Sequence, residues 1–389
     1  MAKQTAKNKL RSAFLWVHRW LGLISGIVVF VVALTGTLYV FEEEGRDIFQ
    51  HKYFYVTPAA TPKKPLQEIS AAVKKVYPKE TITQIRFREQ ADAAIVYHTK
   101  SEKAISVNPY TLQIIGARNL KHDFFSTVLD IHLHLLMGKT GAQIVKWNVL
   151  IFFIMCITGL IIWWPKQKRF FKQAISIKFK AKSWKRVNWD LHSVLGFYAL
   201  FVLLIISFTG MFWVFDSVKS LVSTVTGSPI TKNEKTVSTF IKNSSEYPVE
   251  AAYYTASAME PGAAQVFITN NPGDSLAPIR VLFRYPYAIV RKQNTLFFDK
   301  YTGKLLRADL FRNYTAYDNV SRSNYDFHTG RIRVLGIGSK IIYFLSGLFA
   351  ASLPVTGFLI WWGRRKKKPA ATVQSGKKII IKEPALQKA

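Results

Sequence analysis

Residues 14–41 read FLWVHRWLGLISGIVVFVVALTGTLYVF, and this stretch decides the fold. No charged residue lies between Arg19 and Glu42. The hydrocarbon core of a bilayer is about 30 Å thick, and a helix of about 20 apolar residues crosses it. The stretch is long enough, and it lacks the polar stripe of a helix packed on a soluble core. We therefore predict a transmembrane helix at 14–41. Its apolar run is longer than that of a signal peptide, so we expect an uncleaved anchor.

Three further apolar runs predict three more transmembrane helices. The predicted spans are 132–164 and 328–362, each with an interfacial entry, and 189–215. Four spans place both chain ends on one side of the membrane. The segments on that side are 1–13, 165–188 and 363–389, and the segments on the other side are 42–131 and 216–327.

The distribution of charge gives the orientation. Five basic residues and no acid precede residue 20, and the stretches 165–190 and 364–389 each carry nine Lys or Arg and one acid. The two long segments on the other side are nearly neutral. By the positive-inside rule, the basic side faces the cytoplasm. We expect a multi-pass protein of the bacterial inner membrane, with both termini cytoplasmic and the two long segments periplasmic.

Composition excludes several other classes. The formal net charge of +31 is accounted for largely by the cytoplasmic segments, so we read it as a topology signal and expect no nucleic-acid partner. Aromatic residues make up 14% of the chain, which is too many for a disordered protein. The lone Cys156 excludes a disulfide framework and CxxC zinc or redox sites.

The two periplasmic segments have the patterns of small α+β domains. Apolar and polar residues alternate around 94–107 and again around 281–298, which predicts short antiparallel strands. Turn residues follow at Asn108-Pro109 and at Asp299–Gly303, and the stretch 66–76 suits a helix packed on strands. The predicted fold class is a membrane α-helical protein, a bundle of four transmembrane helices with two extracytoplasmic α+β domains.

The first and third spans overlay without a gap. His18 stands four residues before Gly22, as His192 does before Gly196, and a Thr-Gly pair follows 17 residues after each histidine. The second and fourth spans share another template, in which a Thr-Gly pair lies just before two tryptophans. Upstream of them, Asp130-Ile-His132 matches Asp326-Phe-His328. We infer an internal duplication of a unit made of helix, outer domain and helix.

Histidines at equivalent places in both halves are the functional signal. His18 and His192 are predicted at the cytoplasmic ends of the first and third spans, and His132 and His328 at the outer ends of the second and fourth. Ionisable groups at membrane depth are costly and are usually functional. We prefer His132 to His134 as the outer ligand because of the Asp-x-His repeat, and His134 remains the alternative.

Paired imidazoles from separate helices suit the axial positions of a b-type haem. A structural zinc site would need four ligands, and the spans lack the carboxylates of a di-iron bundle. The sequence predicts two haems, one at each membrane face, with the four histidines as iron ligands. Glycines near the histidines would let the backbone approach the macrocycle, and the candidates are Gly22, Gly138, Gly196 and Gly338. The candidate partners for the haem propionates are Arg19, Lys139, Arg331 and Arg333.

The residues resemble the PepSY-associated transmembrane family, which includes siderophore-iron reductases. The resemblance is carried by Val17–Gly22, His132–Gly138, Asp190–Gly196 and Tyr325–Gly330 together with the Thr-Gly and Trp pairs. The outer stretches Val107–Thr111 and Phe298–Gly303 look like the PepSY turn signature, although Leu112 stands where the second copy has Gly303. The resemblance implies two haems and reduction of ferric chelates outside the cytoplasm.

The residues themselves predict an inner-membrane dihaem protein, and the resemblance implies that it carries electrons to a periplasmic ferric siderophore or other ferric chelate. No dinucleotide fingerprint occurs, so the electron donor would be a quinol or a cytoplasmic reductase. Two alternatives remain. The chain could be a membrane-anchored PepSY module that binds or regulates a partner without redox activity, or, less in keeping with a repeat that runs in parallel, a transporter.

Overall fold

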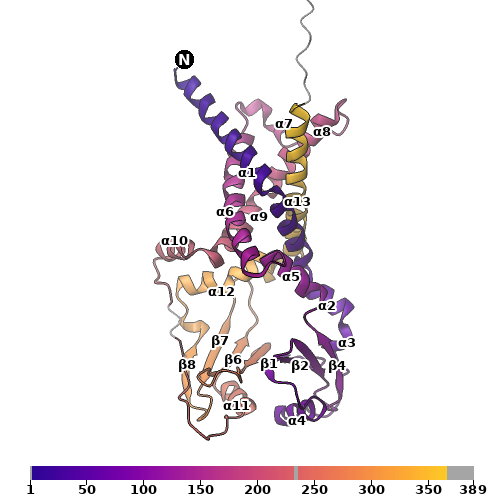
Figure 1. The fold of residues 1–389 in the computed structure, drawn as a ribbon, viewed down its shortest axis with the longest axis vertical. Coiled ribbons are helices and arrows are strands. Elements are labelled where there is room, and N and C mark those ends of the chain that lie inside the picture. The colour runs from indigo at the N-terminus through magenta and orange to yellow at the C-terminus, as the bar shows by residue number, and fades with distance from the viewer. Residues whose placement is uncertain (1, 232–234, 366–389) are drawn as a thin grey trace, which may run out of the picture.

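The computed structural model describes residues 2–231 and 235–365. Four long helices form a bundle at one end of the molecule (Figure 1). They are α1 (Ala2–Val40), α6 (Gly138–Trp163), α9 (Gly196–Val214) and α13 (Ile337–Arg365). The helix α8 (Trp184–Asp190) and a π-helical turn (Leu191–Leu195) run directly into α9.

The four predicted spans are confirmed as helices long and apolar enough to cross a membrane. Their bounds are Lys9–Val40, Gly138–Trp163, Trp184–Val214 and Ile337–Arg364. The expected cytoplasmic tail at 363–389 lies outside the described residues from 366 onward.

The entries to the second and fourth spans are separate helices, which corrects the predicted bounds. The first is α5 (Phe124–His134), which Asp123 caps and which ends where Leu135 and Leu136 adopt positive φ. The second is α12 (Ala316–Thr329), which begins with a capping box and ends at Gly330, with φ of 70°. His132 and His328 therefore lie on these short helices and not on α6 and α13, because a left-handed residue stops the hydrogen-bond ladder between them.

Eight strands form a single antiparallel sheet in the order β4-β3-β2-β1-β5-β6-β7-β8. Their bounds are β1 (Ile82–Arg88), β2 (Ile95–Thr99), β3 (Lys103–Val107), β4 (Ile114–Asn119), β5 (Gln265–Thr269), β6 (Ile279–Arg284), β7 (Gln293–Phe298) and β8 (Leu305–Asp309). We expected two separate domains. The strands of both segments instead join where β1 pairs with β5, with Ile85 opposite Ile268.

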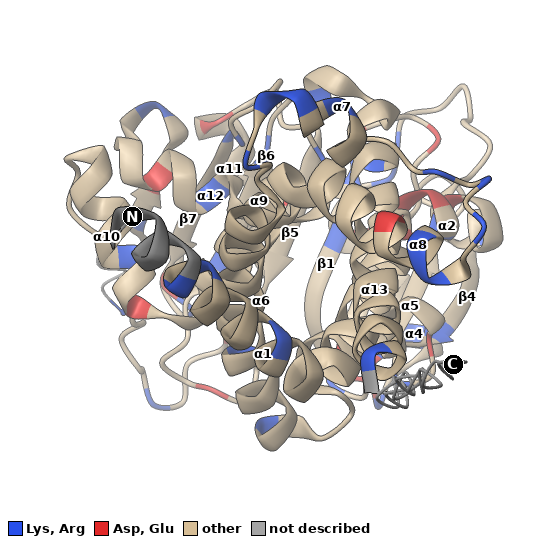
Figure 2. Ribbon diagram, turned by 90° about the horizontal axis from the view of Figure 1, so that it is seen from above, with Lys and Arg blue, Asp and Glu red and all other residues tan. Residues whose placement is uncertain are grey.

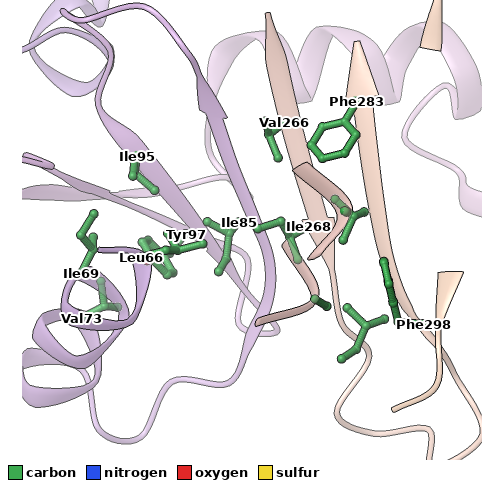
Figure 3. Close-up of a cluster of buried hydrophobic side chains, with 14 of the residues drawn as sticks. Leu66, Ile69, Val73, Ile85, Ile95, Tyr97, Val266, Ile268, Phe283 and Phe298 are labelled. Carbon is green, nitrogen blue, oxygen red and sulfur yellow. The ribbon is translucent and has the colours of Figure 1, made fainter. Parts of the chain in front are cut away.

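One face of this sheet is covered by α4 (Leu66–Val76) and α11 (Val249–Met259), which lie on the side away from the bundle (Figure 1). The predicted helix at 66–76 is confirmed. Leu66, Ile69 and Val73 follow the i, i+3, i+7 spacing of one helix face, and each is at most 3% exposed. Figure 3 shows the core passing without a break from these residues through Ile85 and Ile268 to the second group of strands.

The other face of the sheet looks toward the helical bundle. In the view down the bundle, β1 and β5 lie beneath its middle, between α9 and α13 (Figure 2). Short elements complete the fold, namely α2 (Glu42–Phe49), α3 (His51–Phe54), α7 (Phe171–Ala174), α10 (Asp216–Thr226) and 3₁₀ turns at Lys168–Phe170, Phe311–Asn313 and Arg333–Leu335.

The two predicted turns of the sheet have the same geometry. Leu112 has φ of 64° and Gly303 has φ of 68°, so a leucine adopts the left-handed conformation that glycine takes in the other turn. In each turn a side-chain oxygen, of Asn108 or Asp299, accepts backbone N–H groups two and three residues ahead.

Candidate functional site

The inner histidine pair joins the first and third spans. The rings of His18 in α1 and His192 in the π-helical turn have centroids 6.4 Å apart and are inclined by 84°. A π-helical turn inserts one extra residue and is frequent at functional sites. The sequence predicted both residues, and the structure brings them together.

The outer pair joins α5 and α12. The rings of His132 and His328 have centroids 6.2 Å apart and are inclined by 65°. His134 takes no part in this pair. Its Nδ1 lies 2.7 Å from Asp130 Oδ1, and its side chain is 40% exposed. Of the two outer candidates, His132 is thus the one opposite His328.

Each of the four rings is held by a threonine of a neighbouring helix. The Nδ1–Oγ1 distances are 3.0 Å for His18 and Thr158, 2.9 Å for His192 and Thr356, 3.4 Å for His132 and Thr35, and 3.0 Å for His328 and Thr209. The backbone carbonyl three residues before each threonine also contacts the ring. These carbonyls belong to Met155, Leu353, Val32 and Ile206.

These contacts determine which ring nitrogen carries the proton. Each threonine donates its own hydroxyl hydrogen to the carbonyl four residues earlier in its helix. Its oxygen, like the adjacent carbonyl, therefore accepts a hydrogen bond from the histidine. Because Nδ1–H is the donor, the lone pair of the ring is on Nε2, the form in which a histidine binds a metal.

A glycine follows each of these threonines and gives the ring room. A Cβ atom built on Gly36 would lie 2.9 Å from His132 Cε1, and on Gly159 it would lie 3.3 Å from His18 Cε1. The corresponding distances are 3.4 Å for Gly210 to His328 and 3.2 Å for Gly357 to His192. All four Thr-Gly pairs are thus cradles for one imidazole each.

The cradles were missed by reasoning from the sequence. The Thr-Gly repeats were recognised, but the glycines expected to matter were others. A Cβ on Gly138 or Gly338 would meet no heavy atom within 4 Å, while Gly22 and Gly196 face Met155 and Leu353. The available signal was positional, because these four Thr-Gly pairs repeat at matching positions, 17 residues after His18 and His192 and just before the two Trp pairs.

The ring separations fit a metal held between two imidazoles. A metal–imidazole bond is about 2.0 Å long and the ring centroid lies about 1.2 Å behind the nitrogen, so two axial imidazoles have centroids about 6.4 Å apart. In residues 2–231 and 235–365, no cluster of three or more His, Cys, Asp or Glu side chains is placed to hold a bare metal ion. A pair of imidazoles at each level would suit a porphyrin, because the macrocycle itself supplies the remaining nitrogens to its metal.

A cavity of about 790 Å³ adjoins the inner pair, and His18 and His192 line it. This is the size of a pocket for a cofactor. Four arginines line it as well, two from the first span, one from the start of the third and one from the end of the fourth, namely Arg11, Arg19, Arg186 and Arg364. Arg19, a predicted propionate partner, is therefore at the inner site.

A second cavity, of about 800 Å³, lies between the bundle and the sheet. We call it the outer chamber. Trp213 connects it to the outer pair, because this side chain lines the chamber and its ring centroid is 4.9 Å from that of His328. Arg331, another of the four predicted propionate partners, also lines the chamber. Its guanidinium pairs with Glu42 at 3.1 Å and Glu43 at 3.3 Å, so its charge is balanced within the chain.

The remaining histidines lie outside the two pairs. His98 lines the outer chamber, where burial and the nearby Arg86 and Arg118 lower its pKa to about 4. It is therefore neutral at physiological pH. His51 stacks on Tyr55, with ring centroids 4.5 Å apart.

Comparison with known proteins agrees with this arrangement of membrane helices. A search of curated proteins finds no match to the chain. The family model described as the PepSY-associated TM region matches residues 15–364, nearly the whole described chain. The protein is therefore a member of the PepSY-associated transmembrane family.

Proposed function

We propose that the chain binds two b-type haems and carries electrons across the membrane to a ferric chelate. His18 and His192 would hold the iron of the inner haem, and His132 and His328 that of the outer haem. One observation carries the proposal. Four imidazoles stand in two pairs at the separation of axial ligands, and each is anchored through Nδ1.

The protein's part is to hold the ligands ready. The Thr-Gly cradles fix each ring with Nε2 unprotonated, so no proton has to leave when the metal binds. Arginines at the inner cavity would balance propionate charge, and the guanidinium groups of Arg11 and Arg186 are already held there by Ile162 and Asp190. When bound, each haem iron would accept and release one electron.

The spacing of the two pairs along the bundle supports the proposal that they serve opposite membrane faces. His18 and Gly36, which contacts His132, are 18 residues apart in α1, a rise of about 27 Å. This is close to the thickness of the hydrocarbon core. Electrons would enter at the inner pair from a quinol or a cytoplasmic reductase and leave at the outer pair, with both termini in the cytoplasm.

The acceptor would be a ferric chelate, taken as substrate at the periplasmic side. The reaction transfers one electron to Fe(III) and yields Fe(II). Hard oxygen ligands hold Fe(II) far less tightly than Fe(III), so reduction favours release of the iron. Trp213 supports an exit at the outer chamber, because it bridges the chamber and His328.

A pyridine haemochrome assay on the purified chain tests the haem ligands. We expect two haems per chain, and one after His18→Ala, His192→Ala, His132→Ala or His328→Ala. His134→Ala is the matched control, since His134 bonds to Asp130 and should leave both haems bound. A colourless protein, or one whose pigment survives all four changes, would favour the alternative of a binding module without redox activity.

The reductase step is tested separately. Protein reduced with dithionite and freed of excess reductant is mixed with a ferric chelate under anaerobic conditions. We expect the haem spectrum to return to the oxidised form while a ferrous indicator dye reports one Fe(II) per oxidised haem. A reduced spectrum that persists would reject ferric-chelate reduction and leave the haem assignment standing.

A further inference from the structure

The outer chamber is built from both the sheet and the helices. Its floor is the face of the sheet opposite the apolar core, where cross-strand partners bring polar side chains together. Arg86 of β1 stands opposite Phe267 of β5, and Gln265 stands opposite Arg284 of β6. The neighbouring helices α2 and α12 add Arg46 and Tyr325.

Positive charge is in excess in this chamber. Seven arginines and three carboxylates line it, the arginines being Arg46, Arg86, Arg88, Arg118, Arg284, Arg291 and Arg331. Four of these form ion pairs, with Asp123, Asp47, Asp326 and Glu42 as partners. Within the described chain, the other three have no carboxylate at ion-pair distance, and they are Arg86, Arg118 and Arg284.

Aromatic rings and an amide hold these three guanidinium groups in place. Those of Arg86 and Arg284 lie 5.0 Å and 4.7 Å from the centre of the same ring, Phe267. Arg118 lies 4.5 Å from the ring of Phe54, and it donates a hydrogen bond to Gln50. A ring shared by two guanidinium groups orients both forks without neutralising either.

Two of these guanidinium groups are not fully hydrogen-bonded within the described chain, which is unfavourable for a buried charge. Nε of Arg118 and Nε of Arg284 are buried and have no hydrogen-bond partner among residues 2–231 and 235–365. Burial, together with neighbouring arginines, lowers the pKa of each of these two groups to about 10. A buried charge without a partner is unfavourable. An anion from outside the chain that paired with these guanidinium groups would offset this cost in free energy.

We infer that the outer chamber binds a soluble anion carrying several carboxylates, of the kind that chelates ferric iron, through Arg86, Arg118 and Arg284. The planar fork of arginine matches a carboxylate in two hydrogen bonds. The chamber, of about 800 Å³, has the volume of a site for a small molecule. The inference deepens the proposed function, because it names the substrate class and places it beside Trp213.

Carboxylates could also come from the propionates of a porphyrin held by the outer pair. The two sources predict different results. A soluble anion binds reversibly and competes with salt, whereas propionates arrive with the cofactor and their loss changes the haem content.

Citrate and ferric citrate are the probes, and binding to the full-length chain in detergent is measured by equilibrium dialysis with radiolabelled citrate. We expect saturable binding that weakens with added NaCl. Arg86→Gln and Arg284→Gln should each weaken it about tenfold or more, since each removes a charge-assisted bidentate contact. The matched control is Arg280→Gln, on the same face of β6 but outside the chamber lining, and its affinity should stay within about twofold.

Arg86→Lys is the control for correct folding, because it keeps the positive charge and loses only the planar fork. We expect this variant to bind citrate with intermediate affinity. Saturable citrate binding that neither glutamine variant weakens would overturn the inference, as would no binding at all. So would haem loss in both glutamine variants without citrate binding by the unaltered chain, because the arginines would then serve the porphyrin. Citrate binding needs no redox readout, so a colourless protein that binds citrate through these arginines would reject only the proposed haems.

Discussion

Gly36→Ala tests whether the Thr-Gly pairs are cradles for metal ligands. The new Cβ would lie 2.9 Å from Cε1 and 3.3 Å from Nδ1 of His132. Ordinary carbon contacts begin near 3.4 Å, so the ring must retreat by about 0.5 Å. The nearest part of the ring is the edge between its two nitrogens, and a retreat there moves Nε2 and lengthens the 2.9 Å contact to Val32 O.

The expected magnitude follows from the strain of overpacking. Inserting a methyl group into a packed site typically costs about 1–3 kcal/mol, which is about 5- to 150-fold in an equilibrium constant. We therefore expect the outer haem to bind at least fivefold more weakly. Gly210→Ala acts on the other ligand of the same site, His328, from 3.4 Å, and its effect should be smaller.

The assay is transfer of haem from the purified protein to an excess of an apo-globin, followed by absorbance. The control is Gly338→Ala, where a Cβ meets no heavy atom within 4 Å. Only the haem ligated by His132 and His328 should leave faster in Gly36→Ala, and the inner haem should be retained. Equal transfer rates in Gly36→Ala, Gly338→Ala and the unaltered protein would refute the cradle.

Three further predictions concern single side chains. Thr356→Val should loosen the inner haem, while Thr356→Ser, which keeps the acceptor for His192, should retain it in the same transfer assay. Burial raises the pKa of Asp123, but hydrogen bonds from Arg46 and Gln50 outweigh this and lower it to about 2. Asp123→Asn should therefore cost about 2 kcal/mol in the free energy of unfolding above about pH 4, and thermal melts should show the difference shrinking as the pH falls toward 2. His98 has a pKa of about 4, so a bound dianion should favour its protonation. Sulfate affinity measured by dialysis should be constant from pH 6 to 8 and rise below about pH 5, and His98→Asn should abolish the rise.

The features found from the sequence are those that local patterns determine. A membrane span requires only a run of apolar residues, and a strand with one buried face requires alternation. The helix at 66–76 matched the structure residue for residue because its buried face repeats every three to four positions. The breaks at Leu135 and Gly330 were not foreseen. Apolar residues continue across the first, whereas Gly330, a typical helix terminator, stands between Thr329 and Arg331 and was an available signal.

Features that depend on pairing between distant segments could not be read in this way. Nothing local in β1 or β5 indicates that the two edges join, since Ile85 and Ile268 are 183 residues apart in the chain. The outer chamber did leave a signal. Gln84, Arg86 and Arg88 alternate with apolar residues in β1, which places two arginines on the face opposite the core.

The division of labour between the halves explains why the chain needs both of them. Each imidazole is cradled by a helix of its own half, as His18 is by Thr158 and His328 by Thr209. Each pair, however, takes one ring from either half, and so does the floor of the outer chamber at the joint of β1 and β5. A half alone could orient its own imidazoles but could not bring two of them together at one level. The sheet therefore does more than cover one end of the bundle. The pairing of β1 with β5 joins the two halves at the floor of the chamber, next to the place where His132 and His328 come together.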